Sequence, residues 1–566
     1  MYLDEYKRWL AAELEDADLK PELAKIEGND DEIKDRFAVA LKFGTAGLRG
    51  VLGAGTNRMN IYVVRQATQG LANWVKTQGG TQTVAISYDS RLKSDIFAKT
   101  AAGVLAANGI KVRIYDALMP VPALSFATRY YNCNAGIMVT ASHNPAKYNG
   151  YKAYGPDGCQ MTDEPAAIVY QRIEEIPYFV PAAQSFDFSM AKRDVEFIAP
   201  ELWEEYYQTV LAERVTDVPS DNLNLLYTPL CGTGNKPVRT VLGRIGVHVD
   251  VVKAQEQPDG DFKTCEYPNP ETDAALNESY KIARSTHPDL ILGTDPDCDR
   301  VAVAVPAGDG FRKLSGNELG CLLLDYILGE LTAKGRLPAD PVAVRSIVSS
   351  PMADKVAAKY GVKMRSVLTG FKYIGGEILA LEEKGEENRF VFGFEESCGY
   401  LKGTYARDKD AVVASMLTAD LAAKLKREGM NLADQIDALY AELGYHDAKV
   451  ISIELKGPNA MELSAKFMKD FRAEIPTELG GVRVTSCTDY LSRVRTELAT
   501  GATEPVLLPK SNVVALELGE SGSVIVRPSG TEPKVKLYLT AVDRDPKRAA
   551  ALLERLAEDM KRLAGC

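Results

Sequence analysis

The amino-acid sequence predicts an α/β protein with three similar α/β domains and a smaller C-terminal α+β domain, placed around a central cleft. The first observation is length, since 566 residues are too many for a single hydrophobic core. The second is a pattern that occurs three times, in which a helical stretch ends at a glycine and a β-rich strand follows. These glycine–strand segments are 108–114, 245–251 and 360–364. Glycine is the usual residue just after a helix, so each segment indicates an α/β unit.

The third observation is a second apolar strand after each of these segments, separated from it by about 25–45 residues, the scale of one crossover unit. The second strands are Gly136–Val139, Leu290–Gly293 and Phe390–Gly393. Each runs into a polar loop, and the loops cover residues 140–145, 294–300 and 394–399. Ligands bind beyond the carboxyl ends of strands in α/β sheets, so we expect the three loops to meet at one cleft.

The repeated units and the remaining chain give four expected domains, at residues 1–208, 209–318, 319–446 and 447–566. The first domain begins with a helical extension, indicated by the spacing of Leu3, Tyr6, Leu10 and Leu14. The last domain breaks the repeated pattern because it mixes short strands with helices. Its expected strands are Val450–Glu454, Val482–Thr485, Val524–Arg527 and Lys534–Thr540, and its expected helices are Ala460–Arg472 and Lys547–Leu563.

Composition excludes several classes of protein. Hydrophobic residues make up 46% and charged residues 26% of the chain, and no apolar run reaches the roughly 18 residues that cross a bilayer. The net charge of −11 argues against nucleic acid as a partner. The nine cysteines are scattered and the N-terminus lacks a signal-peptide pattern, so we expect free thiols in the reducing cytoplasm. The sequence carries no signal for an oligomeric state.

The loop after the second strand of the middle unit carries three carboxylates at alternate positions, Asp295, Asp297 and Asp299. Clustered hard oxygen ligands suit Mg²⁺. An EF-hand is excluded, because the sixth and twelfth loop positions are Arg300 and Pro306 rather than glycine and glutamate. A solvated acidic turn is the alternative. Arg300 fits a group that holds phosphate beside the metal.

The corresponding loop of the first unit contains Ser142, His143, Asn144 and Pro145, with Lys152 shortly after it. A serine hydroxyl is a weak nucleophile that needs a metal, a base or a positive field, which His143 and Lys152 can supply. Taken alone, serine before His-Asn-Pro is more often part of a turn than of a catalytic site.

Three further segments carry groups that suit a phosphorylated sugar. Glu395 and Ser397 can bond hydroxyls, and Lys409 precedes an expected helix, Ala411–Leu425, whose free N–H groups can receive phosphate. The segment 527–531 combines a guanidinium, two hydroxyls and a flexible backbone, which suits a phosphate cradle. Solvated acidic loops, a surface helix start and an ordinary turn are the respective alternatives. Neither a Walker A sequence nor a strand followed by G-x-G-x-x-G is present, so a nucleotide cofactor has no support.

In this order, the loops resemble those of the α-D-phosphohexomutase superfamily of phosphoglucomutases and phosphomannomutases, from Phe43 to about Leu537. The resemblance implies that Ser142 is phosphorylated in the active enzyme and lies on the metal together with Asp295, Asp297 and Asp299. It places Arg49, His143 and Lys152 where they assist proton transfer and charge stabilisation. It also implies substrate contacts by a larger set: Arg300, Glu395, Ser397, Lys409, Arg527, Ser529, Gly530 and Thr531.

Two features depart from the family pattern. Gly530 stands where many members have asparagine, and the sugar loop Phe394–Cys398 differs from the Gly-Glu-Met-Ser-Gly form of dual glucose/mannose enzymes. With the segment 151–154, the N-terminal extension and the length, the chain looks most like the bacterial phosphoglucomutases related to animal phosphopentomutases.

The resemblance implies interconversion of glucose 1-phosphate and glucose 6-phosphate through a phosphoserine enzyme and a glucose 1,6-bisphosphate intermediate. Mg²⁺ is then the cofactor, glucose 1,6-bisphosphate the activator, and a phosphosugar the only expected partner. A phosphopentomutase, a phosphomannomutase and a glucose 1,6-bisphosphate synthase remain open as alternatives. A phosphosugar-binding regulator without catalytic activity is the alternative from a different class.

Overall fold

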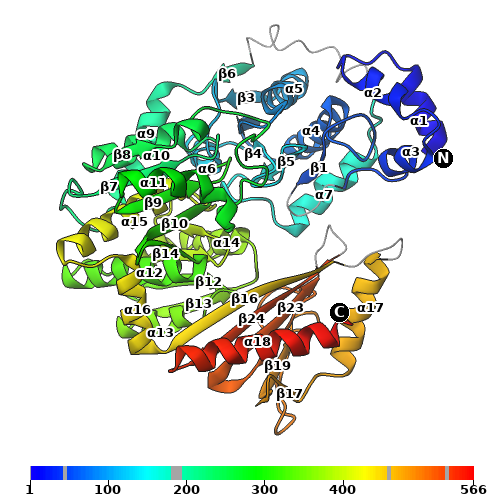
Figure 1. Ribbon diagram of the computed structural model, residues 1–566. Helices are drawn as coiled ribbons and strands as arrows, with labels where there is room; N and C mark the ends of the chain where they lie inside the picture. The colour runs from blue at the N-terminus through cyan, green and yellow to red at the C-terminus, as the bar shows by residue number, and fades with distance from the viewer. Residues whose placement is uncertain (1, 43–46, 180–193, 455–459, 529–533, 566) are drawn as a thin grey trace.

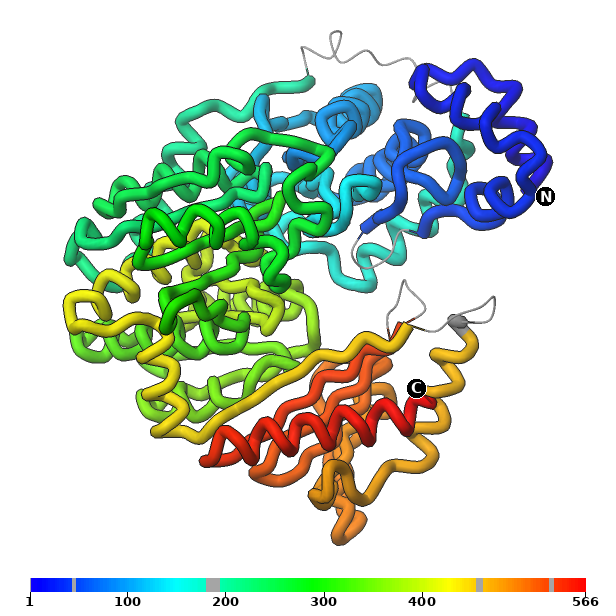
Figure 2. The backbone as a smooth tube through the Cα atoms, viewed as in Figure 1, coloured from blue at the N-terminus to red at the C-terminus, as the bar shows by residue number. Residues whose placement is uncertain are grey.

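The computed structural model describes residues 2–42, 47–179, 194–454, 460–528 and 534–565. Three α/β domains follow one another along the chain, and a C-terminal domain built on an antiparallel sheet lies opposite the first (Figure 1). The tube in Figure 2 shows the chain passing from the blue N-terminal region through the green middle to the orange and red C-terminal domain. The fold class predicted from the sequence is confirmed.

The N-terminal extension forms three helices, α1 (Tyr2–Ala11), α2 (Leu19–Lys25) and α3 (Asp30–Phe37). The expected periodicity is only partly right, because α1 ends before Leu14 and Leu3 is 41% exposed. The buried residues of α1 are Tyr6 and Trp9. The Trp9 ring makes edge-to-face contacts with four other rings at 5.3–6.0 Å, those of Phe37, Tyr62, Tyr178 and Phe179. These aromatic contacts fix the orientation of α1.

The first domain contains a six-stranded sheet in the order β1-β5-β4-β2-β3-β6. Strands β4, β2, β3 and β6 are parallel, β5 runs antiparallel to them, and the edge strand β1 pairs antiparallel with β5. Its elements are β1 (Leu48–Val51), α4 (Ile61–Val75), β2 (Thr83–Tyr88), α5 (Ser94–Ala107), β3 (Lys111–Ile114), α6 (Val121–Tyr130), β4 (Ala135–Val139), β5 (Tyr148–Tyr154), α7 (Asp163–Glu174) and β6 (Val195–Phe197). Helix α9 (Pro200–Ala212) leads into the next domain.

The second and third domains contain sheets of five and four strands, in the orders β11-β10-β9-β7-β8 and β13-β12-β14-β15. The second domain comprises β7 (Asn224–Thr228), α10 (Asn235–Arg244), β8 (His248–Val251), η2 (Lys253–Gln255), η3 (Asp273–Leu276), α11 (Asn277–Thr286), β9 (Leu290–Thr294), β10 (Val301–Ala307) and β11 (Gly310–Leu314). The third comprises α12 (Gly316–Ala333), β12 (Val342–Ser346), α13 (Met352–Lys359), β13 (Lys363–Val367), α14 (Phe371–Glu382), η4 (Glu387–Arg389), β14 (Phe390–Glu395), β15 (Gly399–Leu401), α15 (Ala411–Arg427) and α16 (Leu432–Leu443).

The three α/β sheets share one topology. In each, the first strand of a parallel triplet lies between the second and the third, and the next strand along the chain pairs antiparallel with the third, giving β3-β2-β4-β5, β8-β7-β9-β10 and β13-β12-β14-β15. The glycines that precede the second strand of each triplet, Gly109, Gly246 and Gly361, have φ of 74°, 92° and 69°. Such left-handed values are typical of the residue that ends a helix. The internal repeat predicted from the glycine–strand segments is therefore present.

The C-terminal domain is an antiparallel seven-stranded sheet in the order β16-β24-β23-β22-β19-β20-β21, with α17 and α18 packed against it. Its elements are β16 (Tyr445–Glu454), α17 (Ala460–Ala473), β17 (Glu478–Leu479), β18 (Val482–Arg483), β19 (Ser486–Asp489), β20 (Val494–Glu497), β21 (Thr503–Pro505), β22 (Val514–Glu517), η5 (Gly519–Ser521), β23 (Gly522–Pro528), β24 (Lys534–Asp543) and α18 (Pro546–Leu563). The expected strand Val482–Thr485 is only partly right, because β18 ends at Arg483; it pairs with β17 in a separate two-stranded sheet.

Buried polar contacts join the α/β domains where their loops meet. The Tyr154 hydroxyl at the end of β5 donates a 2.9 Å hydrogen bond to the Asp408 carboxylate before α15. The amide of Ala411, at the start of α15, donates to the carbonyl of Cys298 in the loop after β9. The C-terminal domain is joined at Gly444, whose φ of 91° turns the chain from α16 into β16. No helix among the described residues is long and apolar enough to span a membrane.

Candidate active site

A cavity of about 720 Å³ opens between the four domains. The loops after β4, β9 and β14 all reach it, and β23 and β24 supply its wall on the C-terminal domain. Most of the predicted site residues line it together: Arg49, Ser142, His143, Lys152, Asp299, Arg300, Glu395, Ser397, Lys409 and Arg527. The cleft expected from the three strand ends is therefore present.

The loop after β4 is held by Arg91, a residue that sequence analysis did not select. Its buried guanidinium donates to four backbone carbonyls of the loop, at Ser142, Asn144, Pro145 and Tyr148. It is anchored by Asp89, which lies 3.2 Å from the Arg91 Nε atom and also accepts a hydrogen bond from Thr140. A side chain that satisfies several carbonyls at once gives the loop one conformation.

Ser142 has a φ of 52°, in the left-handed region that L-residues avoid. The corresponding loops after β9 and β14 contain Cys298 and Cys398 with φ of 53° and 64°. One backbone corner thus occurs after the third strand of each triplet. At Ser142 the strained corner is compatible with aiming the hydroxyl into the cleft, and strain of this kind is concentrated at functional sites.

The Ser142 hydroxyl oxygen lies 3.0 Å from an Asp295 carboxylate oxygen and 3.2 Å from the His143 Nδ1 atom. Burial of the imidazole lowers the pKa of His143 well below its ordinary value of 6.5, and the nearby guanidinium groups of Arg300 and Arg49 lower it further. His143 is therefore neutral at neutral pH. A neutral imidazole beside a serine hydroxyl can accept its proton.

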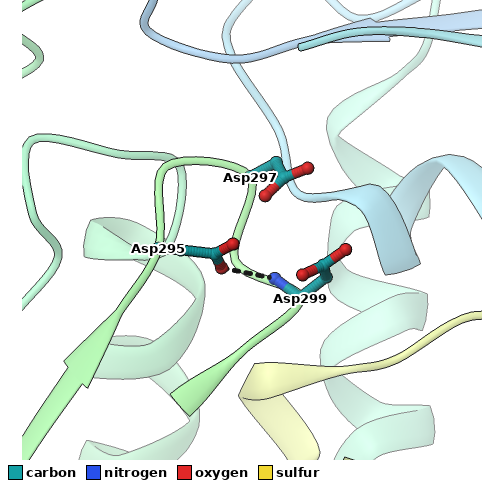
Figure 3. Close-up of side chains that lie close together, drawn as sticks. All are labelled: Asp295, Asp297 and Asp299. Carbon is teal, nitrogen blue, oxygen red and sulfur yellow. Dashed lines mark hydrogen bonds between the residues drawn. The ribbon is translucent and has the colours of Figure 1, made fainter. Parts of the chain in front are cut away.

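The loop after β9 brings Asp295, Asp297 and Asp299 together, with one oxygen from each within 4.8 Å of the others. Figure 3 shows the three carboxylates on this loop, with the Asp299 amide donating a 3.1 Å hydrogen bond to Asp295. All three side chains are buried, and the Oδ1 atoms of Asp297 and Asp299 have no hydrogen-bond partner among the described residues. Buried carboxylate oxygens without partners fit a hard divalent cation.

Asp295 and Asp297 differ in their affinity for protons. Burial, together with the charges of Asp297 and Asp299, raises the pKa of Asp295 well above its ordinary value. Burial also opposes ionisation of Asp297, but the Lys152 ammonium and a hydrogen bond with Asp295 outweigh it, so the pKa of Asp297 is lowered. The same lysine holds Asp297 at 2.9 Å. A bound cation would favour the ionised form of all three.

Lys409 also reaches the aspartate loop. Its ammonium lies 3.1 Å from Asp299 and 3.0 Å from Asp408, and these carboxylates raise its pKa although burial acts in the opposite direction. The expectation that the first N–H groups of the helix after Lys409 are free to bind phosphate is wrong. The Asp410 carboxylate caps α15 and accepts from the amides of Val412 and Val413.

Two arginines flank the Ser142 and aspartate loops. The Arg49 guanidinium donates a 3.3 Å hydrogen bond to the Asn144 side chain, so it lies over the Ser142 loop. The Arg300 guanidinium forms an ion pair with Glu271, and its Nε atom lies 3.7 Å from Asp299. Both positive groups thus border the space above the Ser142 hydroxyl.

The sugar loop and the C-terminal domain form the opposite part of the cleft. Glu395 accepts a 2.6 Å hydrogen bond from the Gly370 amide, and burial raises its pKa despite the charge of Lys409. Ser397 and Arg527 also line the cavity. Ser529, Gly530 and Thr531, which were expected to bind phosphate, lie outside the described residues.

Several cavity residues were missed by sequence analysis. Gln160 and Thr369 line the cavity, and the Nε2 atom of Gln160 and the Oγ1 atom of Thr369 are buried without a hydrogen-bond partner in the described part of the chain. Lys536, on β24, adds a cation close to Arg527 and Lys534. None of these residues belongs to a recognisable motif, and only the folding of distant segments brings them together.

Comparison with known proteins places this architecture in one family. The chain matches four successive domains described as phosphoglucomutase/phosphomannomutase, namely alpha/beta/alpha domain I at residues 40–178, domain II at 204–308, domain III at 315–443 and the C-terminal domain at 491–559. The order of these matches is the order of the domains along the chain.

Individual relatives agree with this assignment. The chain is 35% identical over 516 residues to a phosphoglucomutase of Staphylococcus epidermidis, covering 90% of this chain and 92% of that protein. A phosphoglucomutase of Staphylococcus aureus is also 35% identical, over 517 residues, with 90% and 91% covered.

Two solved structures share the fold. A putative phosphomannomutase from Thermus thermophilus superimposes with a TM-score of 0.68 at 22% identity, covering 92% of this chain and 99% of that one. The open form of a phosphoglucomutase from Paramecium, parafusin, superimposes with a TM-score of 0.66 at 17% identity, covering 94% and 95%. The chain therefore belongs to the α-D-phosphohexomutase superfamily, the family of phosphoglucomutases and phosphomannomutases.

Proposed function

We propose that this chain is a phosphoglucomutase that interconverts glucose 1-phosphate and glucose 6-phosphate, with phosphorylated Ser142 as the phosphoryl carrier. The observation that carries the proposal is the position of the Ser142 hydroxyl, 3.0 Å from Asp295 and 3.2 Å from the neutral imidazole of His143. The name of the bacterial relatives that match 90% of the chain supports glucose as the sugar.

In the forward direction, the bond between phosphorus and the Ser142 oxygen breaks as a bond forms to the 6-hydroxyl oxygen of glucose 1-phosphate. A nearby base takes the proton of the 6-hydroxyl, and a proton is delivered to the departing Ser142 oxygen; His143, 3.2 Å from that oxygen, is the best-placed neutral group for this exchange. The resulting glucose 1,6-bisphosphate turns over in the cleft, and its 1-phosphoryl group returns to Ser142, whose hydroxyl gives up its proton while the 1-oxygen of the sugar gains one. Glucose 6-phosphate is then released, and the phosphoserine is restored.

Phosphoryl transfer depends chiefly on positioning and on neutralising charge. Lys152, Arg49 and Arg300 line the same cavity as Ser142 and are placed to balance the charge of the transferred group. Asp295, Asp297 and Asp299, with the phosphorylated Ser142, would hold Mg²⁺, which supplies positive charge to the phosphoryl oxygens when bound.

The distal phosphate and the sugar hydroxyls need contacts that work in two orientations. Arg527 with Lys536 provides positive charge at the far wall, and we assign Ser529, Gly530 and Thr531 to the same phosphate. Glu395, Ser397 and Lys409 face the space between the two phosphate positions. Glucose 1,6-bisphosphate would act as the activator, because it can restore phosphate to Ser142 after the intermediate is lost.

The reducing cytoplasm is the proposed location. Every cysteine among the described residues is free and buried, as expected for a protein that never meets an oxidising compartment.

The test is formation of glucose 6-phosphate from glucose 1-phosphate by the purified chain with Mg²⁺ and a trace of glucose 1,6-bisphosphate. We expect turnover that stops with EDTA and falls by more than about a thousandfold in Ser142→Ala, as for other lost nucleophiles. Mass spectrometry of the purified wild-type protein should locate phosphate on Ser142. Higher turnover on ribose or mannose phosphates would replace glucose as the substrate, whereas full activity of Ser142→Ala would rule out the phosphoserine mechanism.

A further inference from the structure

We propose that residues 260–271 of the second domain act as a brace that positions the Ser142 loop and Arg300 for phosphoryl transfer. The brace connects η2 with η3 and carries none of the residues selected from the sequence. It contacts the Ser142 loop of the first domain and the aspartate loop of its own domain. The inference rests on the proposed function, because it assigns a role to side chains around the phosphoryl-transfer site.

The first contact is made by Phe262 with Arg91. The Arg91 guanidinium lies 5.0 Å from the centre of the Phe262 ring, a cation–π distance, and it is the group that binds four carbonyls of the Ser142 loop. Phe262 is 1% exposed and has a φ of 46°. A bulky residue in left-handed backbone requires strong packing to hold it there.

The backbone of the brace touches the first domain directly beside this contact. A Cβ atom added at Gly260 would lie 2.7 Å from the Leu92 amide nitrogen and 3.0 Å from the Ser90 carbonyl oxygen. No side chain fits into that space, so the brace and the segment preceding α5 are in van der Waals contact.

The second contact is made by Tyr267 with His143. The two rings meet edge to face, with centroids 5.7 Å apart and an interplanar angle of 83°. The neighbouring Nδ1 atom of His143 lies 3.2 Å from the Ser142 hydroxyl. The half-exposed Tyr267 ring therefore limits rotation of the imidazole that is placed to receive the Ser142 proton.

The third contact is made by Glu271 with Arg300, the arginine that borders Asp299. The position of Glu271 is fixed in turn, because its carbonyl accepts a 2.6 Å hydrogen bond from Lys313 on β11. A charged pair of this kind holds a guanidinium in one orientation.

The brace is internally rigid between these contacts. The Asn269 side chain is 6% exposed, and its Oδ1 atom accepts a 3.0 Å hydrogen bond from the Glu271 amide. The Asn269 carbonyl accepts from the Thr272 hydroxyl at 2.9 Å. The Asn269 amide donates a 2.7 Å hydrogen bond to the Tyr267 carbonyl. Asn269 therefore links Tyr267 to Glu271, and displacement of one is transmitted to the other. The brace joins the proton acceptor to the arginine that faces the phosphoryl group.

The kinetic test uses Tyr267, since it is partly exposed and its replacement leaves the core unchanged. We expect Tyr267→Leu to lower kcat roughly tenfold or more, the scale for misplaced groups, while KM for glucose 1-phosphate changes less than about twofold. Tyr267→Phe keeps the ring and should retain kcat. Tyr130→Leu, at a residue 55% exposed outside the cleft, is the matched control. A rise in KM with unchanged kcat would make Tyr267 a substrate contact and overturn the positioning role.

A double-mutant cycle separates action through His143 from an independent effect. Once His143→Gln has removed the imidazole, Tyr267→Leu should cause little further loss. Losses that multiply in the double variant would show that Tyr267 does not act through His143.

A third measurement does not depend on activity. The chain has four histidines, so selective ¹³C labelling of the imidazoles gives four signals that single substitutions can assign. We expect Tyr267→Leu to shift the His143 signal alone, and Tyr267→Phe to leave it in place. An unmoved His143 signal in Tyr267→Leu would overturn the brace. If the wild-type chain turned over no sugar phosphate, the proposed function would be wrong. The His143 signal would still show whether Tyr267 contacts His143.

Discussion

The ammonium nitrogen of Lys409 lies 3.1 Å from a carboxylate oxygen of Asp299, so a cation from the third domain rests on the aspartate loop of the second. The same ammonium is held at 3.0 Å by Asp408, which accepts a hydrogen bond from Tyr154 of the first domain. Lys409 therefore belongs to a network of contacts that joins all three α/β domains.

Replacing Lys409 by methionine should have opposite effects on metal and substrate. Removing a positive charge beside Asp299 strengthens Mg²⁺ binding, and we expect a gain of about tenfold, or about 1.4 kcal/mol. The KM for glucose 1-phosphate should rise, because a substrate contact is lost. Isothermal titration with Mg²⁺ and steady-state kinetics measure the two effects. Lys402→Met, which removes a lysine paired with Glu213 outside the cleft, is the control. Weaker Mg²⁺ binding in Lys409→Met would contradict the electrostatic argument.

Asp297→Asn should weaken Mg²⁺ binding and turnover together. The Oδ1 atom of Asp297 is buried without a partner among the described residues, and its other oxygen holds Lys152. We expect the Mg²⁺ concentration for half-maximal activity to rise by more than about tenfold, the loss that even outer-shell changes cause at metal sites. Asp95→Asn, on exposed surface, should leave that concentration unchanged. An identical Mg²⁺ titration for Asp297→Asn and the wild type would show that the three aspartates do not bind the metal.

Gln160→Leu should weaken substrate binding. The buried Nε2 atom of Gln160 lines the cavity without a partner among the described residues, so it is available to donate to a phosphate or hydroxyl oxygen. The loss of one hydrogen bond to a charged group corresponds to about 1.5–3 kcal/mol, so KM should rise at least about tenfold. Gln208→Leu, on the outer surface of α9, is the matched control. An unchanged KM would show that Gln160 does not contact the substrate.

The C-terminal domain should lose stability as pH falls from 6.5 to 4. Burial lowers the pKa of His446 to about 4, although its hydrogen bond with the Gly444 carbonyl acts in the other direction. The unfolded chain binds a proton with the ordinary pKa of 6.5. The stabilisation is therefore complete above pH 6.5 and lost as pH falls towards 4, by about 3 kcal/mol.

Hydrogen exchange of the paired β16 and β24 amides reports this change, and the variant His446→Gln should show a smaller pH dependence. The described tryptophans Trp9, Trp74 and Trp203 all lie outside the C-terminal domain, so fluorescence would miss it. Equal pH dependence in the variant and the wild type would assign the acid sensitivity to other groups.

The repeated architecture could be predicted because its signals are local. A glycine such as Gly109 ends a helix in left-handed backbone, and the strand after it is apolar enough to be recognised. The strands of the C-terminal domain were harder to predict. β19, β20 and β21 are three or four residues long, and β20 and β21 contain charged residues and are half-buried and exposed, respectively. Their pairing is determined by the neighbouring strands, which sequence patterns do not report.

Residues of the candidate site could be predicted where they lie together in one loop, as Asp295, Asp297 and Asp299 do. Residues whose role depends on a tertiary contact were missed. Arg91 appears in the sequence as one charged residue after a strand, and only the fold brings the four carbonyls of the Ser142 loop around it. Tyr267 and Glu271 lie in a segment without periodicity. Their partners, His143 and Arg300, follow different strands.

The left-handed corners at Ser142, Cys298 and Cys398 bear on how members of such a lineage can adapt to heat. Each corner costs about 1–2 kcal/mol for a residue with a side chain, and glycine or asparagine relieves it. At the two cysteines we assign no chemistry to the thiol, so descendants selected at higher temperature are free to exchange them and repack the gap. At Ser142 that route is closed while the hydroxyl carries phosphate. Selection for thermal tolerance should therefore replace the strained residue in the second and third repeats and keep it in the first. The repeat that keeps the strained residue is then the one that carries the phosphoryl group.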